Sequence, residues 1–472
     1  MTTLERMNPL DAWFLYAEED GVNHMNILSF IVLDGPPPPY EDLLELVAGK
    51  LPRLPRYRQV IRTVPLQIGR PVWVDDANFD LQFHVRQTAL PQPGDDQVLE
   101  RLIARLMAQQ FDRARPLWEL WSVEGLSDGR WVLLSKLHHA MVDGVSGADM
   151  VSILLDREPE PAPAPVPRVP WKPARAPSNL EIFGGTARGI VTSPVELARA
   201  ASAAVKAPRD AAATVLAGLG AGRRALSGGS ASSLNGPIGP SRRYMWTSYS
   251  LDDVKRVRKA LGGTLNDIVV ATATRGFRDL LLSRGEDVED RTVRVIIPIA
   301  LHARDAKGTA VAAGLYENRI TGVFADLPVG EPDPVERARL IREQLSALKA
   351  SREGVAGDTL TKLSGFAPAT FLALGQRAAA KVHQGTINSV VSNVPGPQVP
   401  LYALGRKVRA AYPSPPIFPV GARMGVAVFS YNGGLHFGLI ADYSTVPDLH
   451  VLRDGIRAGL DELLEATGTP VT

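Results

Sequence analysis

Residues 134–147 read LSKLHHAMVDGVSG, and the order of features in this stretch decides which fold the sequence predicts. The apolar run WVLLSKL at residues 131–137 predicts a buried strand. That strand delivers His138 and His139 to its end, where loops and ligands meet. The residues that follow, DGVSGADMVSILL, predict a helix. A histidine pair between a strand and a helix indicates an α/β protein with a site at the strand end.

A catalytic role suits this histidine pair better than a structural one. The chain has 8 histidines among 472 residues, and two of them are adjacent here. Neutral imidazole is the side chain whose unperturbed pKa, about 6.5, suits a base at the pH of a cell. Asp143 lies near the positive end of the predicted helix, where it can hold the loop by pairing with an arginine, and Gly144 allows close backbone packing. The alternative is a buried pair satisfied by backbone carbonyls, and the H-H-x-x-x-D-G spacing argues against it.

Composition excludes several classes of protein. An apolar fraction of 45% and a charged fraction of 22% are those of an ordinary globular protein, and a net charge of +2 argues against nucleic-acid binding. The chain has no cysteine, which removes disulfides, thiolate catalysis and cysteine-ligated metals and fits a reducing compartment. The start resembles no signal peptide, and no uncharged apolar run approaches the ~20 residues of a membrane span. We therefore expect a cytoplasmic protein that is free to touch a membrane surface.

A long linker is predicted at residues 157–243, where proline, alanine, glycine and arginine accumulate. It contains 12 Arg and Lys against 5 Asp and Glu, so its net charge is +7 and the rest of the chain carries −5. The proline-rich start predicts extended backbone, and the alanine-rich remainder has only weak helical periodicity. A solvated linker with marginal helices is one interpretation. A surface element that attracts anionic lipid headgroups is the other.

The segments on either side of the linker, residues 1–156 and 244–472, both combine predicted strands and helices. The predicted strands lie at residues 25–33, 131–137, 292–301, 318–329, 387–394 and 424–443. The predicted helices lie at residues 40–51, 96–111, 265–285 and 334–351. A hairpin is expected at SYNGGLHF, with positive φ angles at Asn432, Gly433 and Gly434. The whole pattern predicts an α/β fold of two mixed lobes with a site between them.

Other catalytic motifs do not occur in the sequence. There is no G-x-S-x-G elbow, no H-E-x-x-H zinc site and no G-x-x-x-x-G-K-[ST] phosphate loop. GLGAGRR in the linker lacks the spacing and the preceding strand of a dinucleotide loop. Direct group transfer with a histidine base is therefore the simplest mechanism, and a covalent acyl-enzyme is not expected.

Several motifs together resemble one family. HHAMVDG resembles the signature of acyltransferases with the chloramphenicol acetyltransferase-like fold, which use thioester donors and include nonribosomal peptide condensation domains. Further stretches are similar to the bacterial wax ester synthase/diacylglycerol acyltransferase family, and the small, cysteine-free character resembles its actinobacterial branch, where triacylglycerol is the usual product. They are NPLDAWFL at 8–15, RPLWEL at 115–120, LNDIV at 265–269, DLPVGEPDPVERARLI at 326–341 and SNVPGP at 392–397. The resemblance implies two lobes with an apolar tunnel between them.

The resemblance also implies roles for the motif residues. His139 would be the general base that takes the proton from the acceptor hydroxyl, and His138 would support its position or that of the substrate. Asp143 would be structural, and Gly144 would permit the turn. The family usually has an arginine near the position of His302 and a Gly-Asn pair in place of Glu317-Asn318, and these two departures do not touch the histidine motif.

Two more pairs are candidates for shaping the site or binding substrate. Asn266 and Asp267 match the family's Asn-Asp motif, although an Asn at a helix start commonly serves as a cap. Ser392 and Asn393 precede a Pro-Gly-Pro sequence, where turn chemistry is an equal alternative.

Two other matched motifs favour a structural interpretation. The residues Pro9, Leu10 and Asp11 could mark only the start of a helix. Trp118 is expected in the core rather than in a binding site.

The predicted activity is transfer of a fatty acyl group from acyl-CoA to diacylglycerol or to a long-chain alcohol. We expect acyl-CoA as co-substrate with no cofactor and no metal, and partners limited to these lipids and a membrane or lipid-droplet surface, without nucleic acid. A related enzyme that uses a carrier-protein-bound acyl donor is one alternative. A non-catalytic lipid-binding protein of the same fold is the other.

Overall fold

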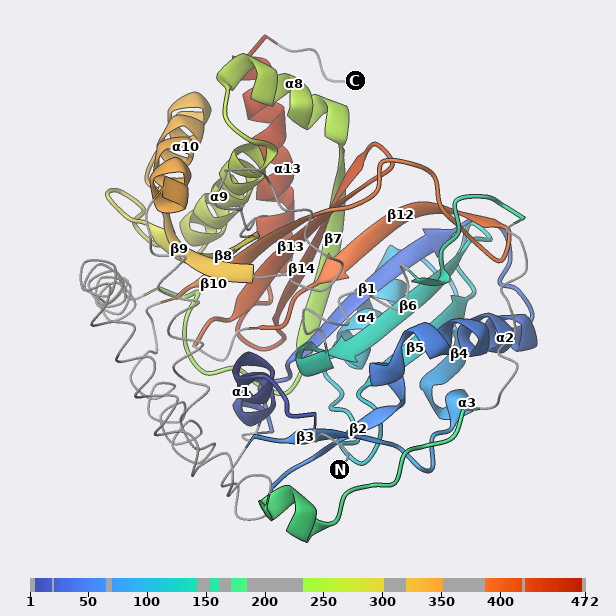
Figure 1. The fold of residues 1–472 in the computed structure, drawn as a ribbon. Coiled ribbons are helices and arrows are strands. Elements are labelled where there is room, and N and C mark those ends of the chain that lie inside the picture. Colours follow the sequence, from blue (N-terminus) through green and yellow to red (C-terminus); the bar gives the residue numbers. More distant parts are fainter. Residues whose placement is uncertain are drawn as a thin grey trace, which may run out of the picture.

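The protein is described from a computed structural model, in which two six-stranded sheets and one two-stranded sheet account for the strands (Figure 1). The described residues are 5–18, 21–64, 70–141, 153–160, 171–184, 232–300, 320–350, 387–417 and 421–468. Asp143, Gly144, His302 and the pair Glu317-Asn318 lie outside these ranges, as does the start of the helix expected after the histidine pair.

The first six-stranded sheet has the order β11-β12-β1-β6-β5-β4. Its strands are β1 (Asn26–Leu33), β4 (Val85–Ala89), β5 (Trp118–Glu124), β6 (Trp131–His138), β11 (Tyr402–Ala403) and β12 (Arg406–Ser414). The β4–β5 pair is parallel, and the other pairs are antiparallel. The strands β11 and β12 come from the C-terminal segment but belong to the first sheet. The segments expected at residues 1–156 and 244–472 therefore do not correspond one to one with the two sheets.

Strand β6 is the centre of the first sheet, and all eight of its residues are buried. Trp131 and Leu133 point to one face, where they pack in a core with Leu43 of α2. Val132 and Leu134 point to the other face, where they pack in a core that includes α4. Burial on both faces explains why this strand reads as a continuous apolar run.

Helices and a small hairpin complete the N-terminal part. They are α1 (Pro9–Ala17), α2 (Tyr40–Lys50), α3 (Leu81–His84), α4 (Asp96–Met107), the 3-10 turns η1 (Leu51–Arg53), η2 (Pro55–Arg58) and η4 (His139–Met141), and the antiparallel pair β2 (Gln59–Arg62) and β3 (Val72–Asp75). The Trp118 side chain is buried and its Nε1–H donates to the Tyr57 carbonyl at 2.8 Å, which confirms that it belongs to the core.

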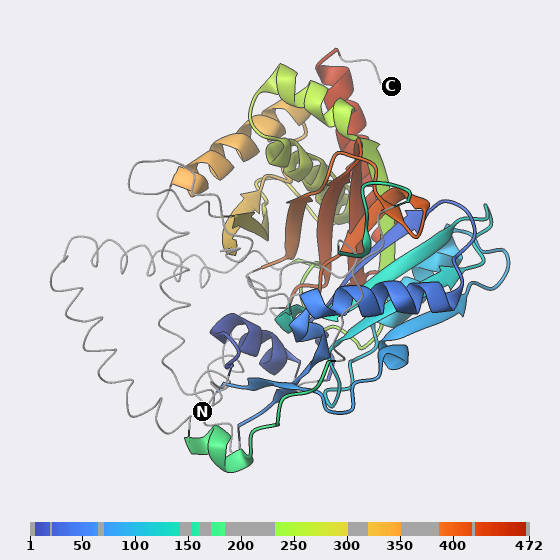
Figure 2. The same ribbon diagram turned by 45° about the vertical axis from the view of Figure 1, so that its right-hand side comes forward.

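The second six-stranded sheet has the order β7-β14-β13-β10-β8-β9. Its strands are β7 (Arg242–Ser250), β8 (Val293–Ala300), β9 (Ile320–Leu327), β10 (Ser389–Pro395), β13 (Met424–Tyr431) and β14 (Gly434–Asp442). The helices are α8 (Leu251–Leu261), α9 (Leu265–Ser283), α10 (Pro334–Ala350) and α13 (Leu449–Ala466). Figure 2 shows these helices together on the side of this sheet that faces away from the first sheet.

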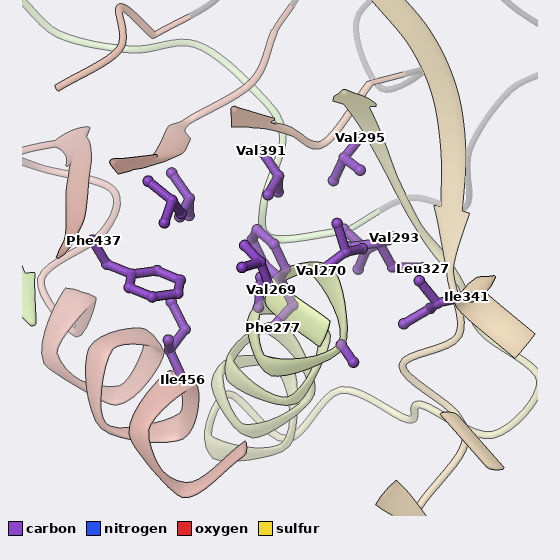
Figure 3. Packing of buried hydrophobic residues seen from close by; sticks show 14 of the residues in the cluster. Val269, Val270, Phe277, Val293, Val295, Leu327, Ile341, Val391, Phe437 and Ile456 are labelled. Carbon is purple, nitrogen blue, oxygen red and sulfur yellow. The ribbon is translucent and has the colours of Figure 1, made fainter. Parts of the chain in front are cut away.

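The core of the second lobe lies between this sheet and its helices. Phe277 of α9 and Ile456 of α13 pack with Phe437 of β14, as Figure 3 shows. Long, amphipathic α13 was not among the predicted elements, and neither were α8 and β7. The helices expected at 265–285 and 334–351 are confirmed as α9 and α10.

The turn between β13 and β14 confirms the expected hairpin with one correction. Asn432 and Gly433 have φ angles of 42° and 85°. Gly434, for which a positive φ angle was also expected, is instead the first residue of β14. The turn therefore needs only two residues in the left-handed region, as a two-residue hairpin loop does.

Part of the linker packs against the N-terminal part of the protein. In residues 171–184, the Ile182 side chain is fully buried in a small core with Val64, Val72 and Val74. The other side chains of residues 171–184 are exposed or half-buried, so this part of the linker is solvated apart from Ile182. Within the described ranges no helix has both the length and the apolar character needed to cross a membrane.

The two sheets come closest where β14 meets β12. A Cβ atom built on Gly438 would lie 1.7 Å from the Pro413 carbonyl oxygen and 2.5 Å from the Tyr244 hydroxyl. That hydroxyl donates to the same carbonyl at 2.8 Å, so β7, β12 and β14 meet at one point. Only glycine leaves room for this approach.

Replacing Gly438 by alanine is expected to destabilise the protein by about 3 kcal/mol, because the added methyl group meets backbone that cannot move aside. Urea unfolding followed by circular dichroism measures this change. Gly49→Ala is the matched control, since a Cβ there meets nothing within 4 Å and alanine favours the α2 helix. Equal midpoints for wild type and Gly438→Ala would contradict the packing argument.

Candidate functional site

His138 lies at the end of β6 and is fully buried. Its Nδ1 accepts a hydrogen bond from the Ala140 backbone N–H at 3.0 Å. In the neutral ring the proton must therefore be on Nε2, which lies 3.2 Å from the Glu18 Oε1 atom. The local backbone thus fixes one tautomer of His138 and places its Nε2 within ion-pair distance of a carboxylate, without a well-aligned hydrogen bond.

Glu18 is a buried carboxylate at the C-terminal end of α1. Burial opposes its ionisation, but contacts with His138, with the Met25 backbone N–H at 2.6 Å and with Arg113 at 3.2 Å outweigh burial and hold the pKa of Glu18 below its usual value. Glu18 is therefore a negative charge next to the histidine pair.

His139 begins the 3-10 turn η4 directly after the strand. Its backbone N–H donates to the Met25 carbonyl at 2.8 Å, and its ring lies 3.9 Å from the Phe14 ring, centroid to centroid. Burial lowers the pKa of His139 to about 4, and the neighbouring His138 adds to this effect. The ring is therefore neutral at the pH of a cell, as a general base must be. Its Nδ1 is buried and makes no hydrogen bond to the residues that the structure describes.

Helix α1 places both Phe14 and Glu18 against the histidine turn. It begins at Pro9, and the Asn8 side chain caps it by accepting from the Asp11 backbone N–H at 2.8 Å. The prediction of a helix start at residues 9–11 is confirmed.

Sequence reasoning missed Glu18, although one signal was available. An acidic residue at a helix C-terminus is electrostatically unfavourable, which suggests that its carboxylate serves another purpose.

Other buried ionisable groups surround Glu18. The Lys136 ammonium donates to the Gln109 carbonyl at 2.6 Å, and burial lowers the pKa of Lys136 to about 8. Burial and the nearby Arg242 lower the pKa of His24 to about 4, and both of its ring nitrogens are buried without a hydrogen bond to described residues. At neutral pH, Glu18 and Lys136 thus carry opposite charges, and the His24 imidazole beside them is neutral.

A hydrogen bond joins the candidate pair Asn266-Asp267 to the candidate pair Ser392-Asn393. The Asn393 amide of β10 donates to the Asn266 side-chain oxygen at 3.2 Å. Ser392 and Asn393 lie within β10, as the strand predicted at residues 387–394 requires. Within the described parts of the chain, no hydrogen bond links these residues to His138 or His139.

The start of α9 differs from the cap that the sequence suggested. Thr264 is the capping residue, and Asp267 completes a capping box by accepting from the Thr264 backbone N–H at 2.7 Å. Asn266 does not cap the helix, which leaves its side chain for Asn393. The second Asp267 oxygen, Oδ1, is buried without a hydrogen bond to described residues.

No set of three His, Asp or Glu side chains in the described ranges converges in a way that could hold a metal ion.

Asp267 lines a cavity of about 140 Å³ between α8, α9 and α10. Arg339 and Arg342 line the same cavity.

Glu18→Gln is expected to lower the free energy of unfolding at pH 7 by about 1–3 kcal/mol, because Met25, Arg113 and His138 lose a charged acceptor. The pKa of Glu18 is lower in the folded state than its ordinary value of 4.5, so the stabilisation is present above that value and is lost as the pH falls through the folded pKa. Urea unfolding at pH 7 and at pH 4 measures both effects.

The matched control is Glu45→Gln on the exposed face of α2, for which we expect a change within about 0.5 kcal/mol. A Glu18→Gln effect no larger than that of Glu45→Gln at pH 7 would contradict the assignment of a buried charge.

Comparisons with known proteins agree with this architecture. Residues 7–269 match the model of the wax ester synthase/diacylglycerol acyltransferase catalytic domain, and residues 316–464 match the C-terminal domain of the same family. A Mycobacterium tuberculosis protein named as a probable diacylglycerol O-acyltransferase, tgs1, is 34% identical over 464 residues, which cover 98% of this chain and 96% of that protein.

Solved structures give the same result. The wax ester synthase/diacylglycerol acyltransferase from Marinobacter aquaeolei VT8 is 25% identical with a TM-score of 0.67, covering 98% of this chain and 100% of that one. The first condensation domain of the calcium-dependent antibiotic synthetase shares the fold at 16% identity and a TM-score of 0.61, over 100% of this chain and 98% of that one. The chain belongs to the wax ester synthase/diacylglycerol acyltransferase family.

Proposed function

We propose that this protein transfers a fatty acyl group from acyl-CoA to the hydroxyl group of diacylglycerol, and also to that of long-chain alcohols. The observation that carries the proposal is the neutral His139 ring, held at the end of a fully buried strand by Met25 and Phe14. Membership of the family supports the choice of acyl donor and acceptor.

The proposed reaction is a single direct transfer. The His139 imidazole takes the proton of the acceptor hydroxyl while the oxygen attacks the thioester carbonyl, which forms a tetrahedral oxyanion. The carbon–sulfur bond then breaks, and the proton on the imidazolium goes to the departing thiolate. The products are one ester and free coenzyme A, and no acyl group is held on the protein.

In this proposal His138 and Glu18 are positioning residues. The Ala140 N–H binds one ring nitrogen of His138, and Glu18 lies 3.2 Å from the other, so both favour one orientation of the ring. A fixed His138 fixes the start of η4 and with it the direction of the His139 ring. The proposed roles of Asp143 and Gly144 are to hold and permit the loop that follows.

Asn266 and Asn393, with their neighbours Asp267 and Ser392, are proposed to shape the substrate-binding part of the site. The Asn266–Asn393 hydrogen bond links the start of α9 to the end of β10. The capping box fixes Asp267, so its part in this proposal is to orient the helix start. Acyl-CoA is proposed as co-substrate without a bound cofactor, and an apolar tunnel between the lobes is proposed for the acyl chains.

The proposed acceptors are insoluble in water, so the enzyme is proposed to work in the cytoplasm at the surface of a membrane or lipid droplet. Burying each CH₂ group of a lipid chain contributes about 0.8 kcal/mol, so the acceptor remains in a lipid phase until a protein site replaces it.

His139→Ala is expected to lower acceptor-dependent thiol release from palmitoyl-CoA by at least about 100-fold, which is the usual contribution of a general base. Dioleoylglycerol and hexadecanol are tested separately as acceptors. His450→Ala is the matched control, because His450 is an exposed histidine on α13. Equal rates for wild type and His139→Ala would overturn the assignment of the base.

The pH dependence of kcat/KM is expected to reflect the low pKa of His139. The reaction needs the neutral ring, whose folded-state pKa of about 4 is below the ordinary value of 6.5. Activity should therefore stay nearly constant from about pH 8 to about pH 5.5 and fall as the pH approaches about 4. Circular dichroism at each pH value separates titration from unfolding. A half-maximal rate near pH 6.5 in folded protein would contradict this assignment.

A further inference from the structure

We propose that residues 171–184, here called the strap, bind the protein to an anionic phospholipid surface through Trp171, Leu180 and Phe183. This inference rests on the proposed function, because it names the surface through which the enzyme reaches its lipid acceptor. It concerns a short part of the linker whose position in the fold is defined.

One side of the strap is fixed to the β2–β3 hairpin. The Ala174 backbone N–H donates to the Asp75 carboxylate at 2.9 Å, and Ile182 is fully buried against the hairpin. The Arg58 guanidinium lies 4.5 Å from the centre of the Trp171 ring. The strap is therefore held as part of the N-terminal lobe, and its two faces are distinct.

Three large apolar side chains of the strap are exposed, although the Arg58 guanidinium lies over the Trp171 ring. Leu180 is 79% exposed, Phe183 is 41% exposed and Trp171 is 37% exposed. Leu180 and Phe183 lie on a helical segment within residues 179–184, together with the buried Ile182. Their spacing of three residues places Leu180 and Phe183 on one face of the helix.

The charged side chains of the strap are Lys172, Arg175 and Glu181, so its net charge is +1. Arg175 pairs with Glu181 at 2.6 Å, whereas Lys172 is exposed, as is Arg62 at the end of β2. The whole linker carries a net charge of +7. Apolar side chains with lysine and arginine around them are typical of elements that lie in the interface of an anionic membrane.

The size and place of the patch favour a lipid surface over a protein partner. A stable protein interface involves about 20–30 residues on each side, and this patch offers three large apolar side chains. Figures 1 and 2 both show the strap helix at the periphery of the molecule, away from the two six-stranded sheets. A surface that protrudes in this way can enter a lipid headgroup layer without a matching groove.

The strap is also connected to the histidine site. The Trp73 N–H of β3, the strand that supports the strap, donates to the Glu5 carbonyl at 2.9 Å, and the Met7 N–H donates to the Pro71 carbonyl at 2.9 Å. Residues 5–7 lead directly into α1, which carries Phe14 and Glu18. Lipid bound at the strap therefore lies against the part of the lobe that supports the proposed base.

The test is co-sedimentation of the full chain with phosphatidylcholine vesicles, with and without phosphatidylglycerol. The double variant Leu180→Asp/Phe183→Asp leaves the buried Ile182 in place. We expect it to weaken binding to vesicles that contain phosphatidylglycerol by at least about tenfold, because two apolar side chains no longer enter the lipid. Binding by wild type should fall when salt is added or phosphatidylglycerol is omitted.

The matched control is Leu282→Asp/Val399→Asp, which removes two apolar residues of similar exposure, 46% and 45%, from the C-terminal segment. This control should bind like wild type. Unchanged binding by the strap variant, or an equal loss in the control, would overturn the proposal. The proposal would also be overturned if sedimentation velocity showed a dimer for the wild type and a monomer for the strap variant.

A catalytic readout separates this inference from the proposed function. With a short-chain alcohol dissolved in water, the strap variant should release thiol from acyl-CoA at the wild-type rate, whereas its rate with dioleoylglycerol in vesicles should fall. Vesicle binding is measured without turnover, so a chain that binds lipid but releases no thiol would contradict the proposed activity alone.

Discussion

The strand β12 is the constraint on which the arrangement of the two sheets depends. It belongs to the C-terminal segment of the chain, yet it pairs with β1 in the first sheet. Its Pro413 carbonyl meets Tyr244 and the backbone at Gly438, so the same strand also fixes the second sheet. The close contact of these three strands fixes how the two sheets sit against each other.

Met25, directly before β1, connects the first sheet to both histidines through its backbone hydrogen bonds. Its N–H binds the Glu18 carboxylate that faces His138, and its carbonyl binds the backbone of His139. The two adjacent imidazoles therefore have different surroundings. His138 has a partner at both ring nitrogens, whereas His139 packs against Phe14 and is kept neutral by burial. Different surroundings give two identical side chains different roles.

The sequence predicted the elements whose patterns are local. The buried strand before His138, the amphipathic helix α4 and the β13–β14 turn could all be read from apolar periodicity and turn residues. The pairing of β12 with β1 could not, because residues about 380 positions apart leave no local signal of contact.

Contacts between residues far apart in the sequence were also missed at the site. The histidine pair was evident from its motif, but Glu18 reaches His138 only through the fold. For Asn393 the sequence predicted a place in a strand, but its hydrogen bond with Asn266, 127 positions earlier in the chain, leaves no local signal.

The pairing of β1 between β6 and β12 has a consequence for how the chain folds during synthesis. Until residues 406–414 have been made, β1 is an unpaired edge strand beside the histidine strand. An exposed apolar edge invites pairing with other chains, and closing a loop of this length is slow. A nascent or truncated chain that ends before β12 is thus exposed to aggregation through the free edge beside the histidine strand.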